Sequence, residues 1–162
     1  NRAQQAHYLE KTSFAGSLGT LGLGIPEVTE FYQYEPVLED IGDNTAVHNL
    51  AKTIEKSEDE NSGNVSAEEK EDAPVKSYAG GVLVTKVPTG VDSDNNVITE
   101  TTTVAEICEA SAAPVNGGPT GFADTVRFKT AEVTVEYEIN AQGDTAEETV
   151  EELACPDLFQ GV

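Results

Sequence analysis

Residues 1–25 read NRAQQAHYLEKTSFAGSLGTLGLGI, and this stretch carries the clearest fold signal in the chain. Its first half consists mostly of good helix formers, and apolar side chains recur near the helical period at Ala3, Ala6, Leu9 and Phe14. No Ser, Thr or Asp precedes this segment as a cap, so we expect residues 1–14 to be the end of a helix that begins earlier. Glycines then interrupt the helix, and the leucines between them predict an apolar loop that packs onto another part of the molecule.

Strand-like segments follow at several places. The aromatic segment Phe31–Leu38 suits a short edge strand, because Pro36 cannot donate a backbone hydrogen bond. The nearly continuous apolar run Tyr78–Val87 predicts a central strand covered on both faces. Val97–Glu109 is rich in Thr and other β-branched residues, and Val126–Ile139 alternates apolar and polar side chains. The sequence therefore predicts a mostly antiparallel sheet after the opening helix.

Two segments between these predicted strands do not have a strand pattern. Thr45–Lys56 predicts a short helix, because Val47, Leu50 and Ile54 fall on one helical face. Residues 57–74 hold almost nothing to bury, which is typical of a solvated loop.

The charge is the most skewed feature of the composition. The chain has 162 residues, the length of one domain, with 30 Asp and Glu against 9 Lys and Arg, giving a net charge of −21. This balance argues against sequence-independent nucleic-acid binding, which needs a basic surface, and against docking on anionic lipid. Much of the acidic charge lies in Glu55–Asp72 and Glu132–Asp157, which we expect to face outward.

The two cysteines, Cys108 and Cys155, have no Cys or His neighbour at metal-ligand spacing, which argues against zinc. An even cysteine count favours one disulfide bond and an oxidising compartment, with two buried free thiols as the alternative.

Candidate catalytic and binding motifs are few. The histidines, His7 and His48, are more typical of surface or packed residues than of a general base, and the chain has no Gly-x-Ser-x-Gly motif. Asp92–Asn96 matches half of a calcium loop, but Val97 stands where that loop needs Gly, so a hairpin turn is the favoured interpretation. Asn64 begins a possible glycosylation sequon, Asn64-Val65-Ser66. We expect no catalytic, cofactor-binding or metal site.

The opening stretch resembles type IV major pilins, in particular the cyanobacterial kind. Later segments are also similar to that family: FYQY at 31–34, SYAGGV at 77–82, AEICEA at 105–110 and Cys155-Pro156. The first 25 residues carry most of the specificity of the resemblance.

The resemblance implies an α+β pilin fold, in which the C-terminal half of a long N-terminal helix packs on an antiparallel sheet of about four strands. Residues 1–162 would then form a single domain. Within it, residues 1–14 would be the end of the long helix, residues 15–76 a loop region between helix and sheet, and residues 77–140 the sheet. A disulfide bond between Cys108 and Cys155 would close a C-terminal loop, the D-region. Since pilins begin with an apolar helix headed by Phe, we expect this chain to be the ectodomain that follows such a helix.

The implied function is structural, not enzymatic. The chain would be a subunit of an extracellular, cell-surface pilus that supports twitching motility, adhesion or DNA uptake, with an inner-membrane precursor. Its partners would be other copies of itself, minor pilins and the assembly machinery. Because the overall charge has the wrong sign, any DNA contact would fall to a minor pilin or to the basic positions Arg2, Lys11, Arg127 and Lys129.

A secreted acidic β-rich binding module, an adhesin or a carbohydrate-binding domain, is the alternative function. Its surface would be Tyr32 and Tyr34 or the Thr-rich strand. Packing on an edge strand is the other interpretation of these tyrosines. The sequence also leaves open whether the chain would be a major or a minor pilin.

Overall fold

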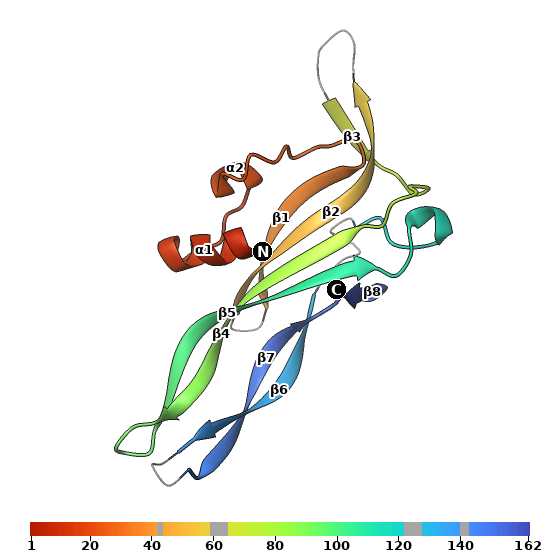
Figure 1. Cartoon of the computed structure of the whole chain (residues 1–162). Coiled ribbons are helices and arrows are strands. Elements are labelled where there is room, and N and C mark those ends of the chain that lie inside the picture. Colours follow the sequence, from red (N-terminus) through yellow and green to blue (C-terminus); the bar gives the residue numbers. More distant parts are fainter. Residues whose placement is uncertain (42–43, 59–64, 122–127, 140–142) are drawn as a thin grey trace.

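The described chain opens with two short helices and continues almost entirely in β-strands (Figure 1). It is seen in a computed structural model that describes residues 1–41, 44–58, 65–121, 128–139 and 143–162. Helix α1 spans Arg2–Lys11, helix α2 spans Leu18–Leu21, and a 3₁₀ turn, η1, spans Pro114–Asn116. No helix in these residues is long and apolar enough to cross a membrane.

The strands form two antiparallel sheets. Their bounds are β1 Tyr32–Ile41, β2 Asn44–Glu58, β3 Val65–Glu69, β4 Tyr78–Val91, β5 Val97–Ala110, β6 Lys129–Glu138, β7 Thr145–Ala154 and β8 Phe159–Gly161. The six-stranded main sheet has the order β1-β2-β4-β5-β8, and β3 pairs with the end of β2. The hairpin β6–β7 is a separate two-stranded sheet, and Figure 1 shows it running beside the far half of β4–β5.

Strand β4 follows its prediction, because it lies in the middle of the main sheet and most of its first half is buried. The predictions for the segments before it need correction. The expected helix at Thr45–Lys56 is wrong, since these residues belong to β2, which pairs with β1 on one side and β4 on the other. Val47 packs in one core cluster and Leu50 in another, because their odd separation of three residues places them on opposite faces of a strand covered on both sides. Such a strand carries apolar residues at many spacings, so it can imitate a helical pattern.

The loop expected over 15–76 is likewise wrong, because it contains α2, β1, β2 and β3, and the main sheet has six strands instead of about four. The solvated loop expected at 57–74 is interrupted by β3, which pairs with Glu58 and its neighbours in β2. The sequon residue Asn64 lies outside the described residues. The helix α1 has ten residues, and the long pilin helix remains a prediction.

The main sheet has a core cluster on each face. On the face that carries α1, Phe14, Val47 and Val82 pack with Tyr8 and Val84. On the opposite face, Leu50, Ala79, Cys108 and Phe128 pack with Val37, Leu153, Cys155 and Phe159. We call these the helix face and the hairpin face.

Two adjacent glycines in β4 let both layers approach the sheet closely. A Cβ atom on Gly80 would lie 2.4 Å from Oδ1 of Asn1 at the start of α1. A Cβ atom on Gly81, pointing to the hairpin face, would lie 2.8 Å from Cδ1 of Leu153. The Gly-Gly pair in the middle of an apolar strand is therefore explained by packing on both faces.

The second acidic stretch forms the hairpin β6–β7, away from α1 (Figure 1). In its register Glu132 lies opposite Glu151, and Glu136 lies opposite Glu147. Like charges directly across a ladder repel, so the hairpin depends on its packing against β4. Its apolar contact there comes from Leu153, which packs in the hairpin-face cluster beside Gly81.

Candidate functional site

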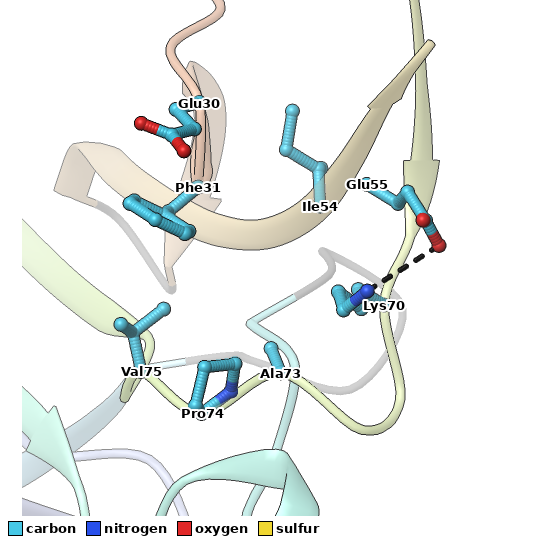
Figure 2. A pocket seen from close by; sticks show the side chains of 8 residues that line it. All are labelled: Glu30, Phe31, Ile54, Glu55, Lys70, Ala73, Pro74 and Val75. Atoms are coloured by element: carbon cyan, nitrogen blue, oxygen red, sulfur yellow. Dashed lines mark ion pairs between the residues drawn. The ribbon is translucent and has the colours of Figure 1, made fainter.

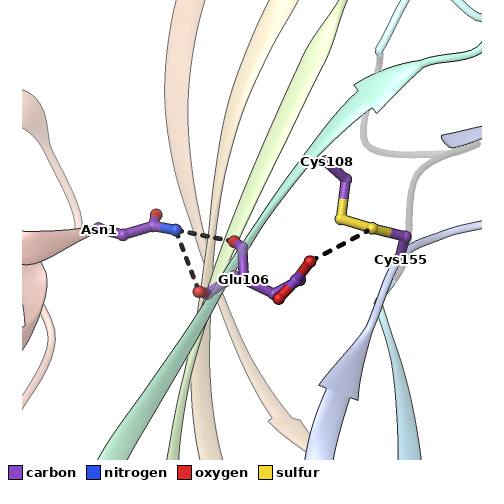
Figure 3. Close-up of a disulfide and its surroundings, with 5 residues drawn as sticks. Asn1, Glu106, Cys108 and Cys155 are labelled. Carbon is purple, nitrogen blue, oxygen red and sulfur yellow. Dashed lines mark hydrogen bonds between the residues drawn. A yellow bond between two sulfur atoms is a disulfide. The ribbon is translucent and has the colours of Figure 1, made fainter. Parts of the chain in front are cut away.

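The start of α1 is anchored on the helix face by hydrogen bonds from one amide side chain. Nδ2 of Asn1 donates to the carbonyl oxygens of Glu106 (2.8 Å) and Gly81 (3.2 Å) (Figure 3). Its Oδ1 accepts from Nδ2 of Asn49 (2.9 Å). The single side chain thus contacts β2, β4 and β5. This position is accessible to it because Gly80 has no side chain.

Two glutamines continue this anchor. Gln4 is fully buried, and its amide pairs both ways with the backbone of Ala15: Nε2 donates to the carbonyl oxygen and Oε1 accepts from N–H, each at 2.9 Å. Gln5 donates from Nε2 to the carbonyl oxygen and the hydroxyl of Thr103 in β5, each at 3.0 Å. The helix therefore meets the sheet largely through polar side chains.

This anchoring corrects the expected apolar stripe of the helix. Phe14 is buried as expected, but Leu9 is 75% exposed and Ala6 is also exposed. The loop after the helix is not fully packed either, since Leu23 and Ile25 remain about half exposed. A helical period in the sequence indicates which residues share a face, but not which face meets the sheet.

A groove lies on the helix face next to Asn1. It extends away from Asn1 on the side opposite to α1. The residues of and after α1 pack against Val82 and Val84 of β4. The groove runs along β4 the other way, from Gly80 toward Tyr78. Its volume is about 220 Å³, and its mostly apolar lining is Asn1, Leu18, Tyr34, Glu35, Pro36, Asn49, Leu50, Ala51, Tyr78, Ala79, Gly80 and Ile107. We call it the Asn1 groove; two of its apolar side chains, Tyr78 (38%) and Ile107 (52%), are exposed.

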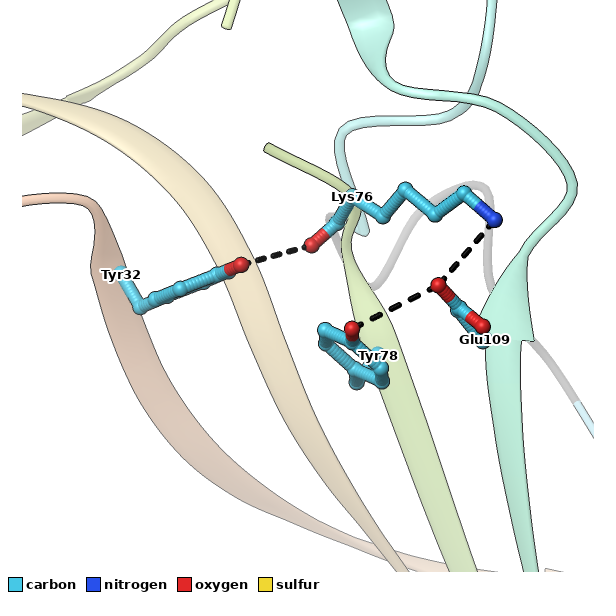
Figure 4. Close-up of polar contacts among 4 residues, drawn as sticks. All are labelled: Tyr32, Lys76, Tyr78 and Glu109. Atoms are coloured by element: carbon cyan, nitrogen blue, oxygen red, sulfur yellow. Dashed lines mark hydrogen bonds and ion pairs between the residues drawn. The ribbon is translucent and has the colours of Figure 1, made fainter. Parts of the chain in front are cut away.

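Three tyrosines form a cluster beside the groove: Tyr34 and Tyr78 line it, and Tyr32 lies next to them. Figure 4 shows Tyr32 and Tyr78 with their polar contacts. The ring of Tyr32 lies 6.1 Å from that of Tyr34 and 6.4 Å from that of Tyr78. The hydroxyl of Tyr32 donates to the carbonyl oxygen of Lys76 (2.9 Å), and Nζ of Lys76 lies 3.0 Å from Oε1 of Glu109. Burial raises the pKa of Tyr32, and the neighbouring Tyr78, Tyr34 and Glu109 raise it further. The half-buried ring and engaged hydroxyl of Tyr32 favour the packing interpretation over an open sugar platform.

A larger hollow of about 490 Å³ lies at the end of β2 (Figure 2). We call it the Glu30 hollow; its lining is Glu30, Phe31, Ile54, Glu55, Lys70, Ala73, Pro74 and Val75. The lysine is engaged with carboxylates of its own chain, since Nζ of Lys70 lies 3.4 Å from Glu55 and 3.8 Å from Asp72. The hollow is thus apolar inside and acidic at its rim.

The structure separates the two histidines. His7 contacts the carbonyl oxygen of Ser13 through Nδ1 (2.7 Å) beside the end of α1. His48 is buried in β2, where Nδ1 lies 3.4 Å from Glu39 and the ring lies 5.1 Å from that of Phe128. Both positions fit structural roles.

The cysteines lie at the end of β5 and directly after β7. Their sulfur atoms are 2.09 Å apart, a disulfide bond, and Oε1 of Glu106 lies 3.9 Å from Sγ of Cys155 (Figure 3). These three side chains are close enough to share a metal ion, but the bond between the sulfurs removes the thiolates that such a site needs. The geometry supports the disulfide expectation.

The calcium-like segment forms the turn between β4 and β5. Oδ1 of Asp92 accepts from the N–H groups of Asp94 (2.8 Å) and Asn96 (2.9 Å), and Oδ2 accepts from Nδ2 of Asn96 (3.0 Å). Because its carboxylate is engaged by donors of its own turn, the hairpin-turn interpretation is favoured. These bonds, with that from the Asn96 side chain the largest effect, hold the pKa of Asp92 below its ordinary value of 3.8.

Replacing Asn96 with alanine should raise the pKa of Asp92 toward that ordinary value, because the strongest of these bonds is lost. The stabilisation from the ionised Asp92 is present above the ordinary pKa and is lost as the pH falls through the lowered one. An NMR titration of the Asp92 carboxyl carbon measures the shift, with Ser93→Ala in the same turn as control. Identical midpoints in wild type and Asn96→Ala would contradict the assignment.

The basic positions considered for DNA contact are dispersed. Arg2 and Lys11 are exposed on α1, while Lys129 pairs with Asp157 at the base of the hairpin (2.6 Å). Arg127 lies outside the described residues. The positions that are described do not form one basic surface.

Comparison with known protein families places most of the chain in a family. A family model, type IV pilin-like G and H, matches residues 1–127. Neither the curated proteins nor the solved structures contain a match. The matched region includes the helix anchor, the Asn1 groove and the Glu30 hollow, and it ends before the hairpin β6–β7.

Proposed function

Since the chain belongs to the family of type IV pilin-like G and H proteins, we propose that it is a structural subunit of a cell-surface pilus. The family match covers most of the chain and is the observation that carries the proposal. We further propose that the pilus is of the type IV kind found in cyanobacteria, and that the chain polymerises with copies of itself and with minor pilins through the pilus machinery. Twitching motility, adhesion and DNA uptake are the tasks such a filament would serve.

The Asn1 groove supports a longer helix as part of this proposal. The backbone enters α1 at Asn1, which lies at the edge of the groove. A helix that continued backward from Asn1 along the helix face would cover the exposed side chains of Tyr78 and Ile107. We therefore propose that an apolar helix preceding Asn1 lies in the groove and carries the membrane and polymerisation contacts. The loop closed by Cys108 and Cys155 would be the pilin D-region.

Filament formation by a groove variant tests both parts of the proposal. The full-length chain is expressed in its native host, and surface filaments are examined by immunogold electron microscopy with antibodies to this domain. The wild type should give labelled filaments. Ile107→Glu should reduce filaments at least about tenfold, because burying a carboxylate against an apolar helix is strongly unfavourable.

Ile98→Glu is the matched control, because Ile98 is on the same strand and similarly exposed (46% against 52% for Ile107) but lies outside the groove. This variant should form filaments normally. Unlabelled filaments, with the wild-type chain released as a monomer, would overturn the pilus function. Saturable binding of that monomer to a glycan array would favour the binding module, with Tyr34 and Tyr78 at the groove as its aromatic side chains.

A further inference from the structure

The outward side of α1 combines an exposed apolar side chain, Leu9, with a cation, Arg2. Arg2, Ala6 and Leu9 follow one another at spacings of four and three residues, so they share a face of the helix. All three are exposed, and Leu9 has 75% of its surface accessible. We call these three residues the outer face of α1; it spans about 10 Å along the helix axis at 1.5 Å per residue.

Helix α1 carries two of the nine cations in a chain with a net charge of −21. Lys52, Lys70, Lys76 and Lys129 each pair with a carboxylate of the same chain. Arg2 and Lys11 form no ion pair with any residue in the described ranges, and neither does the exposed Lys86 in β4. Their charge is thus available to an acidic partner, and the chain itself supplies abundant acidic surface.

The Glu30 hollow has complementary properties. Its interior is formed by apolar side chains, including the exposed Phe31 and Pro74, and its volume of about 490 Å³ readily admits a leucine side chain. Its rim carries Glu30 and Glu55, and its one cation, Lys70, is already paired. The hollow therefore suits an apolar side chain flanked by positive charge.

We propose that the outer face of α1 in one copy of this chain seats in the Glu30 hollow of a second copy. Leu9 enters the hollow between Phe31 and Val75, and Arg2, on the same face of α1, lies toward the acidic rim. This contact rests on the proposed function, and it names a specific interface between neighbouring globular domains of the filament.

The positions of the two surfaces determine what the contact builds. Figure 1 shows α1 and the segment after β3, which lines the hollow, on opposite sides of the main sheet. An interface between two different patches of the same chain is heterologous, so each added copy presents a new free patch. Repetition of the contact therefore produces a chain of subunits instead of a closed dimer.

The contact is small by the standard of stable interfaces, which bury at least about 1,000 Å². It is expected to add to the helix contacts of a filament and not to hold a dimer in dilute solution. The test is therefore made on filaments of the full chain. Engineered cysteines are informative because both natural cysteines are joined to each other.

The first experiment is oxidative cross-linking of filaments that carry Leu9→Cys and Val75→Cys in every copy. Denaturing gels without reductant should show a ladder of dimers, trimers and longer multimers that collapses on reduction. Leu9→Cys alone and Val75→Cys alone should give monomers. The control pair Leu9→Cys with Ser93→Cys, which uses an exposed residue of the β4–β5 turn, should also give monomers.

The possible failures are distinguishable. Labelled filaments in which the Leu9/Val75 pair stays monomeric would overturn the contact while leaving the proposed function intact. Dimers from Leu9→Cys alone would overturn it in favour of a symmetric helix–helix contact. If the wild type forms no filaments, the proposed function fails and the contact fails with it. Leu9→Cys with Glu30→Cys is a second pair, which replaces two exposed residues in case Val75→Cys disturbs folding.

A charge test gives an independent measurement. Leu9→Asp places a carboxylate against the acidic rim, so filaments should release about tenfold more subunit on dilution into low salt. Leu23→Asp is the control, since Leu23 is also exposed (45%) but lies in the loop after α2. Equal release from the two variants would contradict the contact.

Discussion

Replacing Cys108 and Cys155 together with serine should lower the free energy of unfolding by about 4 kcal/mol, the chain-entropy value for a loop of this length. The bond joins residues separated by 47 positions and ties the end of β5 to the end of β7. Both cysteines also pack in the hairpin-face cluster, where Cys108 is fully buried. Urea unfolding followed by circular dichroism measures the difference.

Reduction of the wild-type protein is the matched control, because it breaks the same bond without changing a residue. Reduced wild type and the double serine variant should unfold at similar urea concentrations, both well below the oxidised protein. Equal stability of oxidised and reduced wild type would contradict the prediction.

The hairpin β6–β7 should be the first part to loosen when the bond is absent. Glu132 faces Glu151 and Glu136 faces Glu147 across its ladder, so repulsion weakens the pairing of β6 with β7 once the bond no longer holds β7 in place. Amide hydrogen exchange in β7 should therefore rise more than exchange in β4, and added salt should reduce the difference because it screens exposed charges. A uniform rise over both strands would show that the bond stabilises the whole domain equally.

Replacing Gln4 with alanine should lower the free energy of unfolding by about 3 kcal/mol, because a buried hydrogen-bonding group left unpaired costs about 1–3 kcal/mol. The Gln4 amide is the partner of both the N–H and the carbonyl oxygen of the buried Ala15. Gln4→Glu should be nearly as costly, since a carboxylate cannot donate to that carbonyl oxygen. Urea unfolding again measures the effect.

Gln5→Ala is the matched control, because Gln5 is only partly buried and its lost partner is Thr103 at the sheet surface. It should cost about 1 kcal/mol, the net value of an ordinary hydrogen bond. A Gln4→Ala variant no less stable than Gln5→Ala would show that the buried amide does not fix the helix-to-loop connection.

Local sequence patterns predicted the parts of the fold that depend on one element or on composition. The apolar run of β4 indicated a central strand, because such a strand is buried on both faces whatever its neighbours are. The even cysteine count indicated a disulfide bond, and the opening 25 residues indicated the pilin-like family that the match over residues 1–127 shows. For the candidate site, the sequence pointed to Tyr34 as a possible binding or packing residue, but Asn1 and Gln4 entered only as members of the opening stretch, with no contacts predicted for them.

Tertiary structure decided which partner each element has. Val47, Leu50 and Ile54 have a helical spacing, yet pairing of the first two with β1 and β4 and of Ile54 with β3 holds them in a strand. Strand preference depends on neighbours more than on the residues themselves. The period of α1 allowed either face to meet the sheet, and the buried amide of Gln4, which bonds the backbone of Ala15 and the side chain of Asn49, selected the polar face. The sequence by itself determined the family, the acidic surface and the central strand, since these follow from composition and local pattern. The helix anchor, the Asn1 groove and the Glu30 hollow arise only when residues distant in the chain meet, so only the folded structure decided them.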